Sequence, residues 1–149
     1  MGRKIGIIPT AFVAAMALSQ SAQVAASTTP ADDAAIAKIL DPTLSLLRAG
    51  KSRQAVDTFF TGSPIAAGKS SEMQMLANQV DSTVGIYGPF GECRMVEKRP
   101  HGDFVVQMLY HCQHKHYVTR WTFLFIKTTQ GWQGGNIYFD DKVTAGLDD

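Results

Sequence analysis

The residues whose types and spacing could do chemistry are concentrated in the stretch YHCQHKHY, from Tyr110 to Tyr117. Cys112, His114 and His116 alternate there, so on a continuous strand they would share one face. A thiolate and two imidazoles on one face could together hold Zn²⁺. A turn at His114-Lys115 would break that face, and no local Asp or Glu completes the ligand set. We therefore expect a solvated hairpin tip, with no metal and no cofactor.

The chain has two cysteines, and Cys93 is the only partner available to Cys112. If Gly102-Asp103 forms a two-residue hairpin loop, the two cysteines lie opposite each other on neighbouring strands. We predict a Cys93–Cys112 disulfide, which would remove the thiolate that zinc needs. Strict counting puts the pair at a hydrogen-bonded position, where side chains lie farther apart, so a bulge or a slightly different loop is also expected.

The first residues predict export. Arg3 and Lys4 precede an apolar run over residues 5–18, and small residues follow up to Ala26, which is the three-part pattern of a secretory signal peptide. The apolar run is shorter than the roughly 20 residues of a membrane-spanning helix. We expect a signal peptide over residues 1–26, one domain over residues 27–149, a periplasmic or extracellular location and no membrane span in the mature form.

Charge argues against one class of partner. Of the 14 basic side chains, Arg3 and Lys4 lie in the expected signal peptide, so 12 remain against 13 acidic ones. A mature chain that is nearly neutral gives no electrostatic case for binding nucleic acid.

Helical spacing of apolar residues predicts three helices in the first half of the mature chain. The first covers residues 33–49 and ends at Gly50; Pro42 either kinks it or begins a second short helix capped by Asp41. The next starts at Ser52 and stops before Gly62.

The third of these helices has the clearest signals. Ser71 and Gln74 show capping-box spacing ahead of an apolar stripe, and Gly85 follows the stripe.

Beyond Gly88-Pro89 the period changes to about two, with β-branched and aromatic residues. We predict four strands near residues 90–99, 104–112, 116–127 and 132–140. Helices first and strands afterwards indicate an α+β fold, an antiparallel meander with the helices on one face.

This layout, with the ending TTQGWQGGNIYFDD, resembles the nuclear transport factor two-like superfamily, which includes ketosteroid isomerases. The resemblance implies a curved sheet that forms a cone around the helices, with a ligand or an active site at its open end. An isomerase of that kind needs a carboxylate base and a tyrosine on its first helix, and residues 33–49 contain no tyrosine.

The predicted register points to a ligand face. It places Tyr110 and Trp121 with Phe123 and Phe125 on the inner face, and it adds Tyr138 from the last strand. We expect Tyr110, Trp121 and Tyr138 to provide stacking and hydrogen bonds to a small apolar or aromatic ligand, although ordinary core packing is the competing interpretation of each ring.

Two carboxylates fall on the same face in that register, Glu97 and Asp140. A one-residue slip would turn either into solvent, and we favour that outcome for Glu97. The preferred function is a secreted, non-catalytic domain that binds a small ligand or a protein, with a homodimer left open. The alternative is a small isomerase or hydrolase that uses Asp140 or Glu97 as general base.

Overall fold

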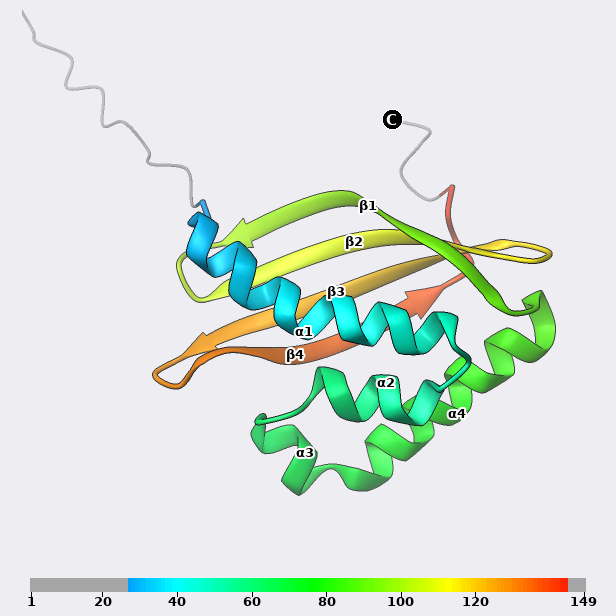
Figure 1. Cartoon of the computed structure of the whole chain (residues 1–149), viewed down its shortest axis with the longest axis horizontal. Coiled ribbons are helices and arrows are strands. Elements are labelled where there is room, and N and C mark those ends of the chain that lie inside the picture. The colour runs from blue at the N-terminus through cyan, green and yellow to red at the C-terminus, as the bar shows by residue number, and fades with distance from the viewer. Residues whose placement is uncertain (1–26, 145–149) are drawn as a thin grey trace, which may run out of the picture.

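The computed structural model describes residues 27–144, so the expected signal peptide lies outside the described residues. The fold is α+β, with four helices followed by four strands, as Figure 1 shows. The helices are α1 (Pro30–Arg48), α2 (Ser52–Phe59), α3 (Pro64–Gly68) and α4 (Ser70–Tyr87). The strands are β1 (Phe90–His101), β2 (Val105–His114), β3 (Val118–Thr128) and β4 (Gly131–Asp140).

Helix α1 begins earlier than expected because Thr29 and Asp32 form a capping box. The Thr29 hydroxyl accepts from the Asp32 amide at 3.1 Å, and the Asp32 carboxylate accepts from the Thr29 amide at 3.1 Å. Pro30 is at the first helical position, where its missing N–H costs nothing. The helix then runs unbroken through Pro42, so the two-helix alternative is wrong.

The expected number of three helices is also wrong, because Gly62-Ser63-Pro64, which follows the end of α2, also begins a further short helix. The Ser63 hydroxyl accepts from the Ile65 amide at 3.2 Å, and Pro64 starts the short helix α3. The capping box expected at Ser71 is absent: α4 begins at Ser70, and the Ser71 hydroxyl bonds to the Glu72 side chain instead.

The sheet is an open antiparallel meander in the order β1-β2-β3-β4. Between β1 and β2 the hairpin loop has three residues, since His101 pairs with Val105. A bulge between Met95 and Glu97 then shifts the register by one residue and brings Cys93 opposite Cys112. The expected bulge and altered loop are therefore both present.

The last hairpin turns at Thr129-Gln130, one residue before the expected turn, because Thr128 pairs with Gly131. Another register shift lies opposite the step from Leu124 to Phe125, where β4 carries the extra residue Gly135. A single extra residue exchanges the two faces of a strand. Beyond it, Phe139 faces inward opposite Trp121, and Tyr138 turns to the outer face.

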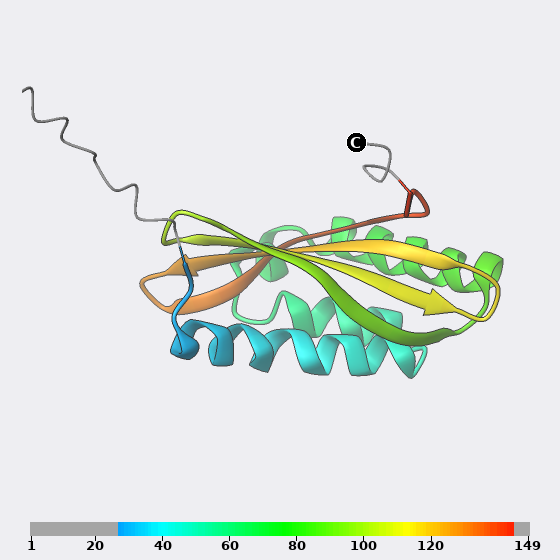
Figure 2. The same cartoon turned by 90° about the horizontal axis from the view of Figure 1, so that it is seen from above.

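The helices pack on one face of the sheet, and α2, α3 and α4 extend past the β4 edge (Figure 1); Figure 2 shows α1 and α2 as a layer along the sheet. Phe59 at the end of α2 is fully buried and packs against Phe123 and Phe125. Gly134 makes this approach possible, because a Cβ there would lie 2.1 Å from the Phe59 carbonyl oxygen.

Candidate functional site

Cys112 lies in the stretch that suggested a metal site, and it is bonded to Cys93 with a Cα–Cα distance of 4.0 Å. The disulfide prediction is confirmed. Because the sulfur of Cys112 is committed to this bond, it is not a thiolate that could bind Zn²⁺.

His114 is buried, which corrects the expectation of a solvated tip for this residue. Its Nδ1 lies 2.9 Å from the Gly88 carbonyl oxygen, and its Nε2 lies 2.9 Å from the Thr119 hydroxyl. The Thr119 hydroxyl also accepts from the Trp121 indole N–H at 2.8 Å. Both ring nitrogens are thus engaged inside the protein. His116 is exposed, as expected, and stands beyond the end of β2.

Three backbone and side-chain bonds attach the β2–β3 hairpin to the segment that joins α4 to β1. Besides the bond between His114 and Gly88, the amide of Lys115 donates to Pro89 at 3.2 Å and that of His116 donates to Tyr87 at 2.9 Å. The stretch that looked most like a metal site is therefore a hairpin end held by a disulfide and a buried imidazole.

The inner aromatic face is closed. Trp121, Phe123 and Phe125 each have 0% of their surface exposed, and Trp121 stacks on Phe139 with 4.5 Å between ring centroids. An indole that is packed on both sides offers no surface to a ligand. Among the described residues, the helices occupy the space where the expected cone would hold a ligand.

The three expected ligand residues do not come together. Trp121 is fully buried and Tyr110 is half-buried beside Phe123, whereas Tyr138 is 61% exposed on the opposite face of the sheet. Desolvation, with a smaller contribution from Asp41, raises the pKa of Tyr110. The extra residue Gly135 is the physical reason why Tyr138 is separated from the others.

The two expected carboxylates are both held by arginines. Glu97 follows the bulge in β1, is exposed, and accepts from Arg99 at 2.6 Å. Asp140 accepts two hydrogen bonds from Arg120, at 2.7 and 3.2 Å, and these hold its pKa below the usual range. Neither side chain lies on the inner face. Glu97 points toward solvent, as expected, and Asp140 also points away from the inner face.

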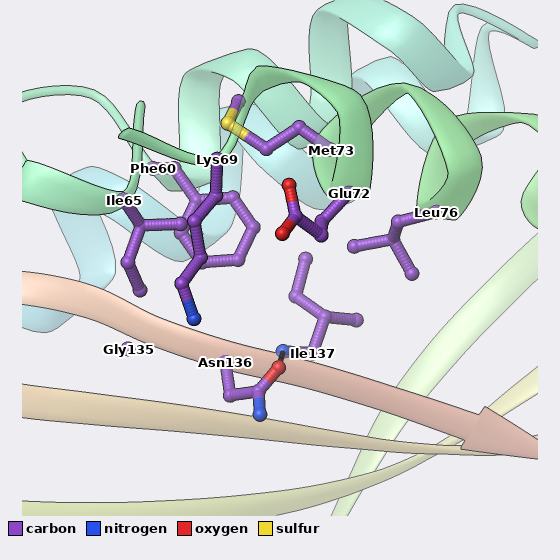
Figure 3. Close-up of a pocket in the computed structure, with 9 residues that line it drawn as sticks. All are labelled: Phe60, Ile65, Lys69, Glu72, Met73, Leu76, Gly135, Asn136 and Ile137. Atoms are coloured by element: carbon purple, nitrogen blue, oxygen red, sulfur yellow. Dashed lines mark hydrogen bonds between the residues drawn. The ribbon is translucent and has the colours of Figure 1, made fainter. Parts of the chain in front are cut away.

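The structure places a hollow elsewhere, between the start of α4 and the free edge of β4, the edge that pairs with no other strand within residues 27–144 (Figure 3). We call this space of about 220 Å³ the β4–α4 hollow. It is lined by the apolar residues Phe60, Ile65, Met73, Leu76 and Ile137, by Lys69 and Glu72, and by Gly135 and Asn136 of the edge strand. Phe60, Met73 and Ile137 are buried and form its floor.

Two opposite charges reach over this hollow, Lys69 from the junction between α3 and α4 and Glu72 from the first turn of α4, as Figure 3 shows. Within residues 27–144, Lys69 makes no ion pair. The Glu72 pKa is lowered, first by a hydrogen bond from its own backbone and then by one from Ser71. The hollow thus has apolar walls and a charged rim.

Sequence reasoning missed this site because its residues come from α2, α3, α4 and β4, with no shared spacing. One signal was available: residues 131–139, GWQGGNIYF, carry no charge and no proline, which is unusual for a strand at the edge of a sheet.

No protein-family profile matches the chain, and no characterised protein is significantly similar to it in sequence. One solved structure is similar: a domain of unknown function with a cystatin-like fold from Nostoc punctiforme, at a TM-score of 0.54 and 14% identity, over 81% of this chain and 83% of that one. At this identity the likeness concerns the fold alone. It corrects the expected nuclear transport factor two-like assignment, which is wrong: helices followed by a meander is a layout that α+β folds share, so element order alone was too weak to choose the family.

Proposed function

We propose that this protein is an exported, non-catalytic binding module and that the β4–α4 hollow is its binding site. The observation that carries the proposal is an apolar space of about 220 Å³ with charged groups only at its rim. A dry cavity of about 150 Å³ is enough to bind benzene. The hollow therefore suits an aromatic ring or a branched aliphatic group.

The rim favours one polarity of ligand. Lys69 is exposed and makes no ion pair among the described residues, whereas Glu72 already accepts from Ser71 at 2.9 Å. A ligand that carries an anionic group beside its apolar part would pair with Lys69. An apolar group joined to a carboxylate is the chemistry that fits.

Export is supported by the Cys93–Cys112 disulfide, since such bonds persist mainly in oxidising compartments. None of the helices within residues 27–144 is long and apolar enough to cross a membrane. Amino-terminal sequencing of the secreted protein tests this part: a start at Ser27 is expected, and full-length protein retained in the cytoplasm would contradict it.

Phenylacetate, an aromatic carboxylate, is the probe that tests the site. During an NMR titration we expect the methyl signals of Ile65, Met73, Leu76 and Ile137 to shift together. Leu76→Trp should fill the hollow and abolish these shifts. The matched control is Met75→Trp, because Met75 directly precedes Leu76 in α4 and is 56% exposed. Equal binding by parent and Leu76→Trp, or shifts confined to other residues, would contradict the proposal.

One observation favours the enzymatic alternative: Tyr87, Asp140 and Asp141 line a second hollow of about 190 Å³. A general base works best when its pKa lies near the working pH, but Arg120 lowers the pKa of Asp140. The Tyr87 hydroxyl is also engaged, since it donates to Asp141 at 2.7 Å. If an activity is measured, its loss in Asp140→Asn with unchanged stability would support the enzyme.

A further inference from the structure

We propose that the natural occupant of the β4–α4 hollow is an apolar side chain of an extended peptide segment, which pairs with the free edge of β4 as a fifth strand. This inference rests on the proposed function and specifies its ligand. Its first support is the direction of the backbone groups of β4.

In an antiparallel sheet, successive residues direct their N–H and C=O groups to opposite sides. The Lys127 amide donates to the Phe104 carbonyl just before β2, at 2.8 Å, so the odd-numbered residues of β3 face β2. Even-numbered residues, such as Thr122, must then bond to β4. Thr122 pairs with Tyr138, so beyond Gly135 the even-numbered residues of β4 bond to β3.

Ile137 and Phe139 therefore present their N–H and C=O groups to the free edge. The Ile137 amide donates to its neighbour's side chain, the Asn136 Oδ1, at 2.8 Å (Figure 3). This local bond satisfies the amide until a strand displaces it. Ile137 lines the hollow, so the edge and the hollow form one continuous site.

The two edges of the sheet differ in protection. The β1 edge carries Lys98, Arg99 and Pro100, residue types that block the addition of a strand. The β4 edge has none of these between Gly131 and Phe139. An unprotected edge beside an apolar hollow has the features that peptide-binding sheets use: backbone bonds supply affinity and a side-chain pocket supplies selectivity.

Geometry also defines the peptide. The residue directly opposite Ile137 shares its face and enters the hollow, so it should be apolar. Lys69 stands over the Gly135 end of the hollow (Figure 3). In an antiparallel peptide, the residue nearest to Gly135 is two positions after the residue opposite Ile137. An acidic residue at that position would pair with the ammonium. The peptide motif is thus apolar-any-acidic.

A second copy of the chain fits this site less well. A symmetric β4–β4 pair would place one concave hollow against another and leave both unfilled, whereas a peptide can insert a protruding side chain.

The probe is the peptide acetyl-Thr-Val-Thr-Leu-Thr-Asp-Thr-amide, titrated by NMR into the full exported protein. Replacing its Leu by Ser should weaken binding about 10- to 100-fold, the loss expected for one buried aliphatic side chain. N-methylation of the Leu amide, which faces β4, should abolish binding. N-methylation of either adjacent Thr amide, which faces away, should leave the affinity unchanged.

Two readouts on the protein complete the test. Peptide binding should slow amide hydrogen exchange at Ile137 and Phe139, and Leu76→Trp should block it whereas Met75→Trp should not.

The outcomes separate the two proposals. If phenylacetate enters the hollow but the position of the N-methyl group has no effect, the peptide inference fails and the small-ligand function stands. If neither probe shifts the methyl signals of the hollow, both fail. If exchange at Ile137 and Phe139 is slow without peptide and slows further as a dimer forms with rising protein concentration, the occupant of the edge is a second copy of the chain. That result would overturn the inference.

Discussion

The Nε2 atom of His114 lies 2.9 Å from the Oγ1 atom of Thr119, inside the protein. The Gly88 carbonyl beside the Nδ1 atom can only accept, so the tautomer with its hydrogen on Nδ1 fits this contact. Nε2 then accepts from Thr119, whose oxygen accepts from the Trp121 N–H. Each member of this chain of hydrogen bonds is satisfied by the next.

Removing the hydroxyl should therefore be costly. Thr119→Val keeps the shape but leaves the Trp121 N–H and the His114 Nε2 without partners, and we expect a loss of about 1–3 kcal/mol in the free energy of unfolding. Thr119→Ser keeps the hydroxyl and should lose less. Urea unfolding of the three proteins measures the difference. A valine variant as stable as the serine variant would show that the bonds are not important for stability.

The disulfide could be predicted from the sequence although the first count assumed a two-residue loop. The hairpin loop has three residues where two were expected, and the bulge between Met95 and Glu97 removes the difference before Cys93. Period-two alternation and the expected export to an oxidising compartment were sufficient evidence for the pairing, whereas the position of the bulge has no local sequence signal. The same shift also determines the orientation of Glu97, whose side chain points away from the inner face.

The candidate site could not be predicted. Extending the predicted pairing across the sheet places Tyr138 on the inner face, and the extra residue Gly135 reverses that placement. The hollow depends on how far α3 and α4 extend past β4, which is a property of packing and not of any local pattern.

Gly134 should tolerate no side chain. In Gly134→Ala, the new Cβ would meet the Phe59 carbonyl oxygen at 2.1 Å, so the end of α2 must move away from the sheet. Overpacking of this kind costs about 1–3 kcal/mol or more.

The control for Gly134→Ala is Gly85→Ala, at an exposed position of α4 where a Cβ meets nothing within 4 Å. This variant should gain about 0.5–1 kcal/mol from helix propensity. Thermal unfolding of both variants checks the pair. An unchanged midpoint for Gly134→Ala would contradict the close approach of α2 to β4.

Asp32 should make stability depend on pH. Its carboxylate accepts from Lys127 at 2.8 Å and from the Trp132 indole at 2.7 Å, and these bonds, with those from Thr29, lower its pKa. A lowered pKa in the folded state gives stability that is fully present above the unfolded pKa, about 3.9, and is lost as the pH falls through the folded value.

The test of Asp32 compares urea midpoints of the parent and Asp32→Asn. The variant should be less stable at neutral pH, and the gap should narrow as the pH falls below about 4. Asp81→Asn, on the exposed side of α4, is the control and should show no such gap. A gap of constant size across this range would mean that the contribution of Asp32 does not depend on its charge.

Substitution of Trp121 tests whether this residue lines a ligand site or belongs to the packed core. Its indole is 0% exposed, stacks on Phe139 and meets Phe90 edge-on with 5.5 Å between ring centroids, so Trp121→Ala should cost the full 3–5 kcal/mol, roughly, of a packed aromatic. Tyr138→Ala, on the outer face, should change stability by less than about 0.5 kcal/mol.

Phenylacetate binding at the β4–α4 hollow should survive in Trp121→Ala under conditions in which the variant is folded, because Trp121 does not line that hollow. A small stability loss together with lost phenylacetate binding would instead place the ligand against Trp121, as the aromatic pattern of the sequence first suggested.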